Sequence, residues 1–267
     1  MKEYLKQLPK EIVDLIYLAR DIGSFCNMPV YLVGGFVRDL LLGVKNLDLD
    51  IVVKGNGIKF AEDFATHLKA KLIRHKRFGT ATIIINHHLK IDVASARKEF
   101  YPEPAHLPVV SSGSLKDDLF RRDFTINAMA ISISTENFGK PVDFFGGKRD
   151  LDNKKIRILH NLSFIDDPTR ILRAIRFETR YDFRIEPKTL RFLKEAVKLK
   201  MLDNLEPQRI RDDLILILKE KHPLKEIRRL EKLVGLGFIS PHRLISKKTY
   251  KLLYSIEKEI SWFQKIY

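Results

Sequence analysis

The stretch from Tyr31 to Val53, YLVGGFVRDLLLGVKNLDLDIVV, constrains the fold more than any other part of the sequence. It begins with an apolar run that predicts a strand, continues through Gly34-Gly35 and a Leu-rich segment that predicts a helix, and ends in a second apolar run. Asp48 and Asp50 interrupt this second run. Because a buried carboxylate without a partner is costly, we expect something cationic to meet these two side chains.

The composition predicts a folded globular protein, because 267 residues with 45% hydrophobic content are enough for one or two domains with real cores. The first residues lack the apolar centre of a signal peptide, and no segment has the apolar length of a membrane span. We therefore expect a cytoplasmic protein with no membrane partner; the sequence does not indicate an oligomeric state. The single cysteine, Cys26, excludes an internal disulfide and is expected to be a small core residue near a helix end.

The net charge of +15 is unevenly distributed, with +4 over residues 1–150 and +11 over residues 151–267. This asymmetry favours a polyanion such as nucleic acid as a partner of the second half, although a basic balance also fits an ordinary soluble surface. The motifs have to decide between these two interpretations.

The periodicity of apolar residues predicts a mixed sheet with helices packed on it, followed by a helical remainder. Strands are expected at 30–33, 48–53, 80–85, 89–93 and 128–133, and helices at 10–26, 36–42 and 58–69. From Asp166 onward the pattern is helical almost throughout, with no convincing strand, which places a domain boundary near 150–160. Residues 98–116 carry three prolines, three serines and a glycine, and they predict a long functional loop.

Asp48 and Asp50 are two residues apart, so in a strand both side chains project from the face opposite to that of Leu49 and Ile51. Two neighbouring carboxylates repel each other unless cations neutralise them, and Mg²⁺ is a hard ion that bridges carboxylates and substrate phosphates. An exposed edge strand whose polar face carries aspartates is the alternative. Asp92, on another predicted strand, either completes the metal set or is a strand-end charge.

The glycines before the predicted helix suit the binding of a phosphate, because backbone can approach closely there and the helix N-terminus favours an anion. Arg38, one turn into that helix, is placed to reach the same anion. In a nucleotidyl transfer, two metal ions clamp the attacking and leaving oxygens, and an aspartate can accept the proton of the attacking hydroxyl.

Several motifs, in this order, resemble those of the class II tRNA nucleotidyltransferase and bacterial poly(A) polymerase superfamily. They are GGFVRD with LDLD, DDLFRRDFTINAMA (117–130), DFFGGKRDL (143–151) and DDPTRILRAIRF (166–177), and the resemblance covers roughly Tyr31 to Leu214. It implies an α+β fold with a polymerase-β-like nucleotidyltransferase head over residues 1–155, which includes an N-terminal helix. A helical neck over 156–220 with the nucleobase-selecting helix and an incomplete helical body over 221–267 are implied to follow.

The resemblance also implies site residues in the head. Asp48 and Asp50 are implied to bind two Mg²⁺ ions, and Asp92 is carried as the third catalytic aspartate. The nucleotide-binding positions implied in the head are Gly34, Gly35, Arg38, Arg122, Asp123 and Asn127. Asp123 and Asn127 are expected to order the site, while Arg121 and Arg122 suit a triphosphate-facing charge.

The segment DDPTRILRAIRF predicts a helix with Pro168 in its first turn and Asp166 or Asp167 as its cap. Ile171, Leu172 and Ile175 are expected to form its packed face. Asp167, Arg170, Arg173 and Arg176 follow at three-residue steps, so one alternative for the first two is an ordinary i,i+3 ion pair.

The functional interpretation of this helix is base selection. Cytosine and adenine each present an exocyclic amine beside an unprotonated ring nitrogen, which one acceptor, Asp167, and one donor, Arg170, would fit. Uracil and guanine reverse this pattern and would leave buried polar groups unpaired. The resemblance implies this use of Asp167 and Arg170, with Arg173 and Arg176 supporting the nucleotide or the helix.

The expected activity is template-independent addition of CMP, AMP or both, from CTP or ATP, to a tRNA 3′ end with release of pyrophosphate. A bacterial poly(A) polymerase and a non-catalytic RNA-binding module are the alternatives. Candidates for contacts with the RNA backbone are Lys188, Arg191, Lys194 and Lys198, which fit an ordinary solvated helix face equally well. The loop at 98–116 is expected to be mobile.

The sequence departs from the family pattern at three positions. Gln208 stands where the family usually has glutamate, Asp213 where a longer acid is usual, and Asp92 where glutamate is common. Family members also usually continue beyond the position of Tyr267, so we expect weaker tRNA binding than in longer relatives.

Overall fold

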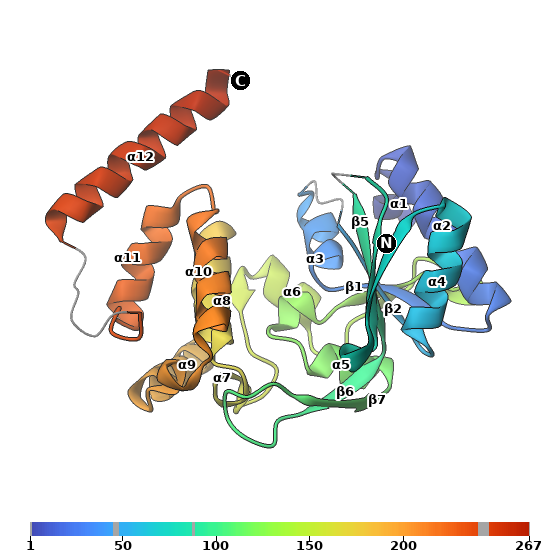
Figure 1. Cartoon of the computed structure of the whole chain (residues 1–267), viewed down its shortest axis with the longest axis horizontal. Coiled ribbons are helices and arrows are strands. Elements are labelled where there is room, and N and C mark those ends of the chain that lie inside the picture. The colour runs from blue at the N-terminus through green and yellow to red at the C-terminus, as the bar shows by residue number, and fades with distance from the viewer. Residues whose placement is uncertain (1, 45–47, 87–88, 240–245, 267) are drawn as a thin grey trace. The chain divides into compact units, whose positions relative to one another are not determined.

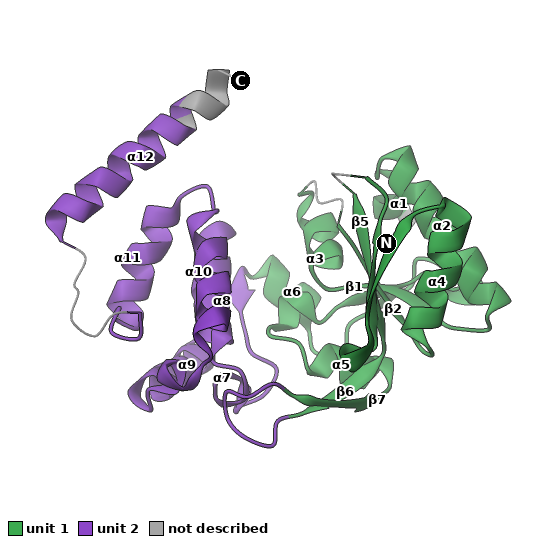
Figure 2. Ribbon diagram, viewed as in Figure 1, with its two compact units in different colours: residues 1–100, 108–153 green, residues 101–107, 154–267 purple. Residues whose placement is uncertain are grey.

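The computed structural model describes residues 2–44, 48–86, 89–239 and 246–266. The chain forms two compact units, residues 1–100 with 108–153 and residues 101–107 with 154–267 (Figure 2). The short segment 101–107 therefore belongs to the second unit, although the residues on both sides of it belong to the first. The assignment of a head at 1–155, a neck at 156–220 and a body at 221–267 stays a prediction.

The first unit is built on a mixed sheet of seven strands. In spatial order these are β3 (Lys71–His75), β4 (Thr80–Ile84), β5 (Lys90–Ser95), β2 (Leu49–Val53), β1 (Val30–Val33), β8 (Ala130–Ser132) and β9 (Pro141–Val142). The predicted strands all form. The strand that contains Asp50 begins at Leu49, so Asp48 precedes it and is exposed, where the sequence had placed both aspartates inside the strand.

Within the described residues of this sheet, β2 and β5 form the one parallel pair, and their register matters for the site. Asp50 lies directly beside Asp92, and the pairs before and after it are Leu49 with Ile91 and Ile51 with Val93. Because side chains alternate between faces, the two aspartates project from one face of the sheet. Their apolar neighbours are at most 1% exposed on the other face.

Helices cover both faces of this sheet, with α2 and α4 on one side and α3 and α6 on the other (Figure 1). The helices of this unit are α1 (Lys2–Lys6), α2 (Lys10–Phe25), α3 (Gly34–Leu42), α4 (Gly57–Leu68), α5 (Leu115–Phe120) and α6 (Gly147–Asp152). The Asn56 side chain caps α4 by accepting from the Lys59 amide, and Ser114 begins α5 in a capping box with Asp117. Phe36, Phe60 and Phe64 are buried between helices and sheet.

The segment expected as one long loop at 98–116 contains a hairpin. β6 (Arg97–Phe100) pairs antiparallel with β7 (Val109–Ser112), and α5 starts at Leu115. Three prolines, at 102, 104 and 108, lie between the strands or at their edge and therefore remove no ladder hydrogen bond. The loop prediction holds only for the connection between the strands, residues 101–108.

The second unit is mainly helical. Its helices are α7 (Ser163–Asp166), α8 (Thr169–Arg180), α9 (Pro187–Lys198), α10 (Pro207–Leu218), α11 (Pro223–Leu233) and α12 (Lys247–Ile266). Three of them begin at a proline, which is favourable in a first turn because its missing N–H would have no partner there. The predicted apolar face of α8 is confirmed, since Ile171, Leu172 and Ile175 are fully buried.

Two sequence expectations about this part and about Cys26 were wrong. Two-residue strands, β10 (Lys155–Ile156) and β11 (Arg184–Ile185), pair in parallel, so the helical remainder does contain a strand. Cys26 lies at the end of α2 as expected, but it is half-buried rather than in the core, and its thiol donates to Asp63 Oδ2 at 3.6 Å. Among the described residues, no helix is both long and apolar enough to cross a membrane.

Candidate active site

Gly34 is the residue around which the first half of the site is built. It starts α3 with a φ of +67°, a conformation that favours glycine, and its N–H donates to the Met129 carbonyl. A Cβ at this position would lie 2.5 Å from Arg122 Nη1 and 3.6 Å from Asp50 Oδ2. The absence of a side chain thus lets a guanidinium and a carboxylate approach the strand-to-helix turn together. At Gly35 a Cβ would be in ordinary contact with Arg38, 3.5 Å from Nη2.

Arg122 is held in place by Asp118, a residue that the sequence analysis did not single out. Asp118 is fully buried, and its Oδ2 accepts from Arg122 Nη2 at 3.0 Å while its Oδ1 accepts from Arg121 Nη2 at 2.8 Å. Burial alone would raise the pKa of Asp118, but the two guanidiniums outweigh it and lower that pKa. Its position in the DDLFRRDFTINAMA motif, four residues before Arg122, was the available signal.

Arg38, Asn127 and Asp123 form one buried network, as expected of residues that order a site. The Arg38 guanidinium donates to both carboxylate oxygens of Asp39 at 2.9 Å and to Asn127 Oδ1 at 2.5 Å. Asn127 Nδ2 in turn donates to Asp123 Oδ1 at 2.9 Å, and the Phe124 amide donates to the same oxygen. Arg38 is thus engaged by protein groups; its direct contact with a nucleotide stays a prediction.

Asp50 and Asp92 place two carboxylates side by side on the sheet. Burial raises the pKa of Asp50 to about 6, since the favourable charge of Arg122 is opposed by the nearby carboxylates of Asp92 and Asp48. Asp92 accepts from the Thr82 hydroxyl at 2.6 Å and from Lys90 Nζ at 3.2 Å. Asp92 therefore lies beside the other aspartate and also forms the ion pair expected of a strand-end charge.

The chemistry of these residues fits a divalent cation. Across the described ranges, no group of three or more His, Cys, Asp or Glu side chains converges closely enough to enclose an ion. Burial raises the pKa of Asp50 despite the charge of Arg122, so a bound cation would stabilise the ionised carboxylate, and Mg²⁺ is commonly held by one or two carboxylates together with phosphate oxygens. Asp50, Asp92 and Arg122 line a hollow of about 360 Å³ that could admit such a ligand.

Asp167, in the second unit, is fixed by groups that the sequence analysis did not anticipate. Its Oδ1 accepts from Arg209 Nη2 at 2.8 Å, from the Thr169 hydroxyl at 2.6 Å and from the Thr169 amide at 3.2 Å. Of the two aspartates considered as a cap, it is Asp167 that bonds the first residue of α8. Arg209 also donates to the Ala105 carbonyl at 2.9 Å and so joins the segment 101–107 to α8.

Arg170 is buried at 4% exposure, and its Nη1 donates to the Ser163 hydroxyl at 2.6 Å. Its Nε lies 4.0 Å from Asp167 Oδ2, at the outer limit of an ion pair. The i,i+3 pair considered from the sequence is therefore loose, because each member is held mainly by another group. The acceptor Asp167 Oδ2 and the donor Arg170 Nε therefore lie next to each other without forming a close hydrogen bond between them.

Arg173 and Arg176 continue along the same helix and contact the Phe177 ring, at 5.5 Å and 4.9 Å from its centroid. Arg176 is buried and also pairs with Glu220 Oε1 at 3.3 Å, just beyond the end of α10. Burial and the neighbouring Arg173 lower the pKa of Arg176. These contacts tie Arg176 to its own helix and to the end of α10, and its implied role at the nucleotide stays a prediction.

Two of the three residues that depart from the family pattern, Gln208 and Asp213, lie on α10. Gln208 Nε2 donates to Asp212 Oδ1 at 2.7 Å, within the same helix. Burial raises the pKa of Asp213, and the nearby Arg173 and Arg176 oppose this increase. The shorter carboxylate thus still lies in the electrostatic field of the arginines on α8.

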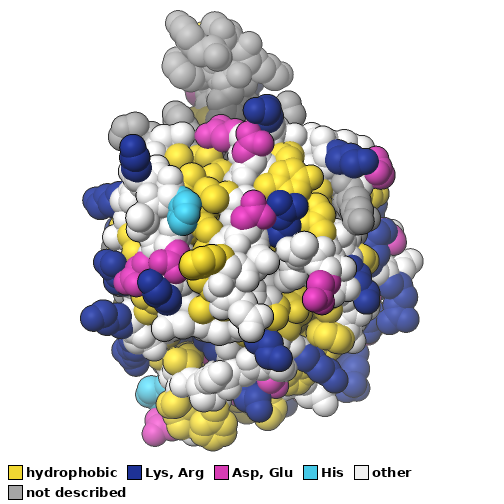
Figure 3. Space-filling view, turned by 90° about the vertical axis from the view of Figure 1, so that its right-hand side faces the viewer, with side chains coloured by type: hydrophobic (Ala, Val, Ile, Leu, Met, Phe, Trp, Pro, Cys, Tyr) yellow, Lys and Arg dark blue, Asp and Glu magenta, His cyan; other side chains and the backbone are white. Residues whose placement is uncertain are grey.

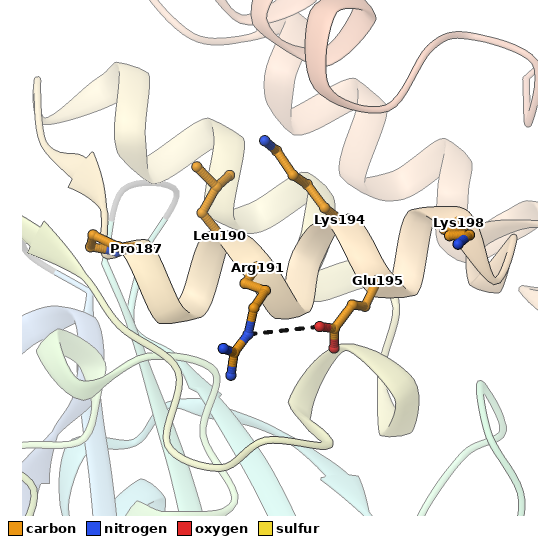
Figure 4. Close-up of a pocket in the computed structure, with 6 residues that line it drawn as sticks. All are labelled: Pro187, Leu190, Arg191, Lys194, Glu195 and Lys198. Atoms are coloured by element: carbon orange, nitrogen blue, oxygen red, sulfur yellow. Dashed lines mark ion pairs between the residues drawn. The ribbon is translucent and has the colours of Figure 1, made fainter.

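The basic residues proposed for the RNA backbone lie on α9, where Arg191, Lys194 and Lys198 border a shallow hollow of about 350 Å³ (Figure 4). Arg191 pairs with Glu195 at 3.7 Å. Both side chains of this pair are more than half exposed, so the pair is weak and water can compete for it.

Comparison with known proteins agrees with this arrangement. The profile of the Poly A polymerase head domain matches residues 30–157. An A-adding tRNA nucleotidyltransferase of Geobacter sulfurreducens is 47% identical over 98% of this chain and 30% of its own length. The chain thus spans about a third of that relative.

Solved structures are similar over most of the chain. One is a CCA-adding enzyme without ligand, with a TM-score of 0.89 and 48% identity over 99% of this chain and 62% of the other. Another is a tRNA nucleotidyltransferase complexed with a primer tRNA and an incoming ATP analogue. It has a TM-score of 0.80 and 38% identity over 91% of this chain and 68% of the other.

Proposed function

Because this chain belongs to the class II tRNA nucleotidyltransferase family, we propose that it transfers CMP, AMP or both to the 3′ end of a tRNA. In this reaction the RNA 3′-hydroxyl attacks the α-phosphate of CTP or ATP. A phosphodiester bond forms, the bond between the α- and β-phosphates breaks, and pyrophosphate and a proton are released.

The observation that carries the proposal is the meeting of Asp50, Asp92 and Arg122 at the turn opened by Gly34. The guanidinium of Arg122 supplies fixed positive charge for the triphosphate, and Asp118 holds it in position. The hydrogen bonds of Arg38, Asn127 and Asp123 hold the start of α3 against the segment that follows Arg122.

Asp48 and Asp50 are the residues that would hold Mg²⁺, with Asp92 next to them as a further carboxylate. When bound, the ion neutralises these carboxylates and stabilises the charge that develops on the transferred phosphate. Asp50 contributes a carboxylate that is already partly shielded from water, and Arg122 offsets part of its charge.

Base selection is assigned to Asp167 and Arg170. Arg209 and Thr169 fix one carboxylate oxygen of Asp167, which leaves Oδ2 oriented beside Arg170 Nε. An acceptor next to a donor matches the amine and ring nitrogen of cytosine or adenine, and it leaves uracil or guanine with unpaired groups.

For the RNA backbone we propose the basic residues of α9, with exposed cations aligned on one helix. Glu195 and Leu190 border the same hollow, and on the face drawn in Figure 3 Lys and Arg side chains are likewise interspersed with acidic and apolar ones. If these residues contact phosphates, RNA binding should weaken as the salt concentration rises. The slope of log affinity against log salt concentration should then be about −1 for each contact.

The decisive assay supplies Mg²⁺ and one labelled nucleotide at a time, with tRNAs ending before the first C or after CC, or with an unstructured RNA. Incorporation of C alone, A alone or both identifies the nucleotides that are added. Long A tails on unstructured RNA would identify a poly(A) polymerase instead. RNA binding without incorporation under any condition would identify a binding module.

The site assignment has its own test. Asp48→Ala and Asp50→Ala should abolish transfer and leave the far-ultraviolet circular dichroism spectrum unchanged. Asp14→Ala, at an exposed acidic position on α2 in the same unit, is the matched control and should retain activity. Retained transfer in either of the first two variants would refute the metal assignment.

A further inference from the structure

The first unit exposes a cluster of aromatic rings that the proposed mechanism does not use. Phe120 and Phe144 are 44% and 50% exposed, and Phe145 lies between them, with ring centroids 5.7 Å and 6.1 Å away. Lys116 Nζ lies 6.0 Å from the centroid of Phe144. We call these four residues the aromatic platform.

The platform is attached to rigid groups. Lys116 and Phe120 are one turn apart on α5, so they project from one side of the helix, while Asp118 and Leu119 are buried on the other. The ring of Phe144 comes from the turn before α6, whose backbone is fixed by Asp143. The Asp143 carboxylate accepts from the amides of residues 145, 147 and 148.

The position of the platform in the chain connects it to the site. Phe120 is the last residue of α5 and stands two residues before Arg122, whose guanidinium lies against Gly34 and near Asp50. The buried face of α5 carries Asp118, which holds that guanidinium. One short helix thus presents an arginine-positioning carboxylate on its inner face and an aromatic ring with a lysine on its outer face.

The platform combines exposed aromatic rings with one neighbouring cation, Lys116. The rings are inclined to one another, at 44° between Phe120 and Phe145 and at 69° between Phe144 and Phe145. Among the nearby carboxylates, Asp118 is paired with Arg121 and Arg122 and Asp152 with Lys148, while Asp117 and Asp143 accept from uncharged donors. An exposed ring with a neighbouring cation suits a nucleobase and its phosphate, since every base has a π-face.

We propose that the aromatic platform stacks the unpaired nucleotides at the 3′ end of the RNA substrate. The inference rests on the proposed function for the identity of its ligand, and it adds a surface on the first unit that holds the end of the acceptor. Phe144 and Phe120 supply stacking, and Lys116 supplies a contact to phosphate.

The test measures RNA binding without nucleoside triphosphate, so it does not depend on catalysis. The probe is a short single-stranded RNA with 2-aminopurine at its 3′-terminal position, whose fluorescence falls when the base stacks. The wild-type chain should quench it. Phe144→Ala and Phe120→Ala should bind about 5- to 100-fold more weakly and lose the quenching, in line with the loss of one stacked base.

Three further variants make the result specific. Phe144→Tyr keeps a π-face and should retain quenching, whereas Lys116→Gln should reduce the salt dependence by about one phosphate contact. Phe25→Ala removes a ring that is 91% exposed on α2 and should change nothing. Circular dichroism confirms folding in each case.

Wild-type quenching and affinity in both alanine variants would overturn the platform, as would an equal loss in Phe25→Ala. It would also be overturned if the alanine variants lost self-association in sedimentation but kept RNA binding, because the surface would then join protein copies. If labelled nucleotide is incorporated while the alanine variants bind normally, only the platform fails. If nothing is incorporated while quenching persists, only the proposed transfer fails.

Discussion

Glu226 provides the sharpest test of the energetics of this structure. It lies on α11 at 2% exposure, and its Oε2 has no hydrogen-bond partner within the described part of the chain. Burial raises its pKa to about 8, and the negative charge of Glu220 adds to this increase. A hydrogen bond with Thr179 and the positive charges of Arg176 and Arg180 act in the opposite direction. The carboxyl is therefore protonated in the folded chain at pH values where it is ionised in the unfolded chain.

The sign of the pH dependence follows from this difference. Below about pH 4.5 both states hold the proton, and stability does not depend on this group. As the pH rises from 4.5 to about 8, only the folded state keeps the proton, so the free energy of unfolding falls. At about 1.36 kcal/mol per pH unit, this interval corresponds to about 5 kcal/mol, which relaxation of the site would reduce.

The perturbation is Glu226→Gln, which keeps the shape and cannot ionise. Burying the glutamine amide changes stability by an amount that does not depend on pH. The readout is therefore how the difference in free energy of unfolding between the variant and the wild type changes with pH. Between pH 4.5 and 7, the free energy of unfolding of the variant should rise by about 3 kcal/mol relative to that of the wild type, and by more at pH 8. Urea unfolding followed by circular dichroism measures it.

Glu195→Gln is the matched control, because this carboxylate is more than half exposed on α9. Its stability difference from wild type should stay nearly constant over the same pH range. A constant difference for Glu226→Gln between pH 5 and 9, or an equal slope in the control, would refute the argument that burial of this carboxyl costs free energy.

Three further predictions concern the site. Gly34→Ala should destabilise the chain by about 1–2 kcal/mol in urea unfolding, because the positive φ disfavours alanine and the new Cβ meets Arg122; unchanged stability would contradict this. Arg209→Gln should raise misincorporation of UMP or GMP relative to CMP and AMP about tenfold, because Asp167 loses its charged partner; unchanged selectivity in single-nucleotide assays would refute the positioning role. Mg²⁺ affinity, measured by calorimetry, should fall as the pH is lowered through about 6, because protons compete for Asp50, and a flat profile between pH 5 and 8 would exclude that carboxylate as a ligand.

The local features of the fold could be predicted from the sequence, because each depends on residues close together in the chain. The strand over 30–33 and the buried face of α8 follow from the alternation and spacing of apolar residues. The resemblance of the motifs implied which aspartates and arginines to expect. Asp50 and Arg122 do meet at the turn opened by Gly34.

Contacts between distant segments could not be predicted in the same way. The register that sets Asp50 beside Asp92 depends on how two strands align whose paired residues are 42 positions apart, and the hairpin of β6 and β7 closes across a proline-rich connection. Arg209 as the partner of Asp167 could not be predicted either, because the two lie 42 residues apart and a charged residue in a helix usually faces solvent, whereas Asp118 lies only four residues before Arg122.

The segment 101–107 gives the chain an interleaved topology. Ala105 has a φ of +65° and is 4% exposed; its amide donates to the Ile165 carbonyl and its own carbonyl accepts from Arg209. A protease or a gene truncation that cuts once, after residue 153, would leave this segment on the first fragment and its partners on the second. Neither half would then be a whole folding unit, so dissection of this protein requires a circularly permuted or a two-cut design.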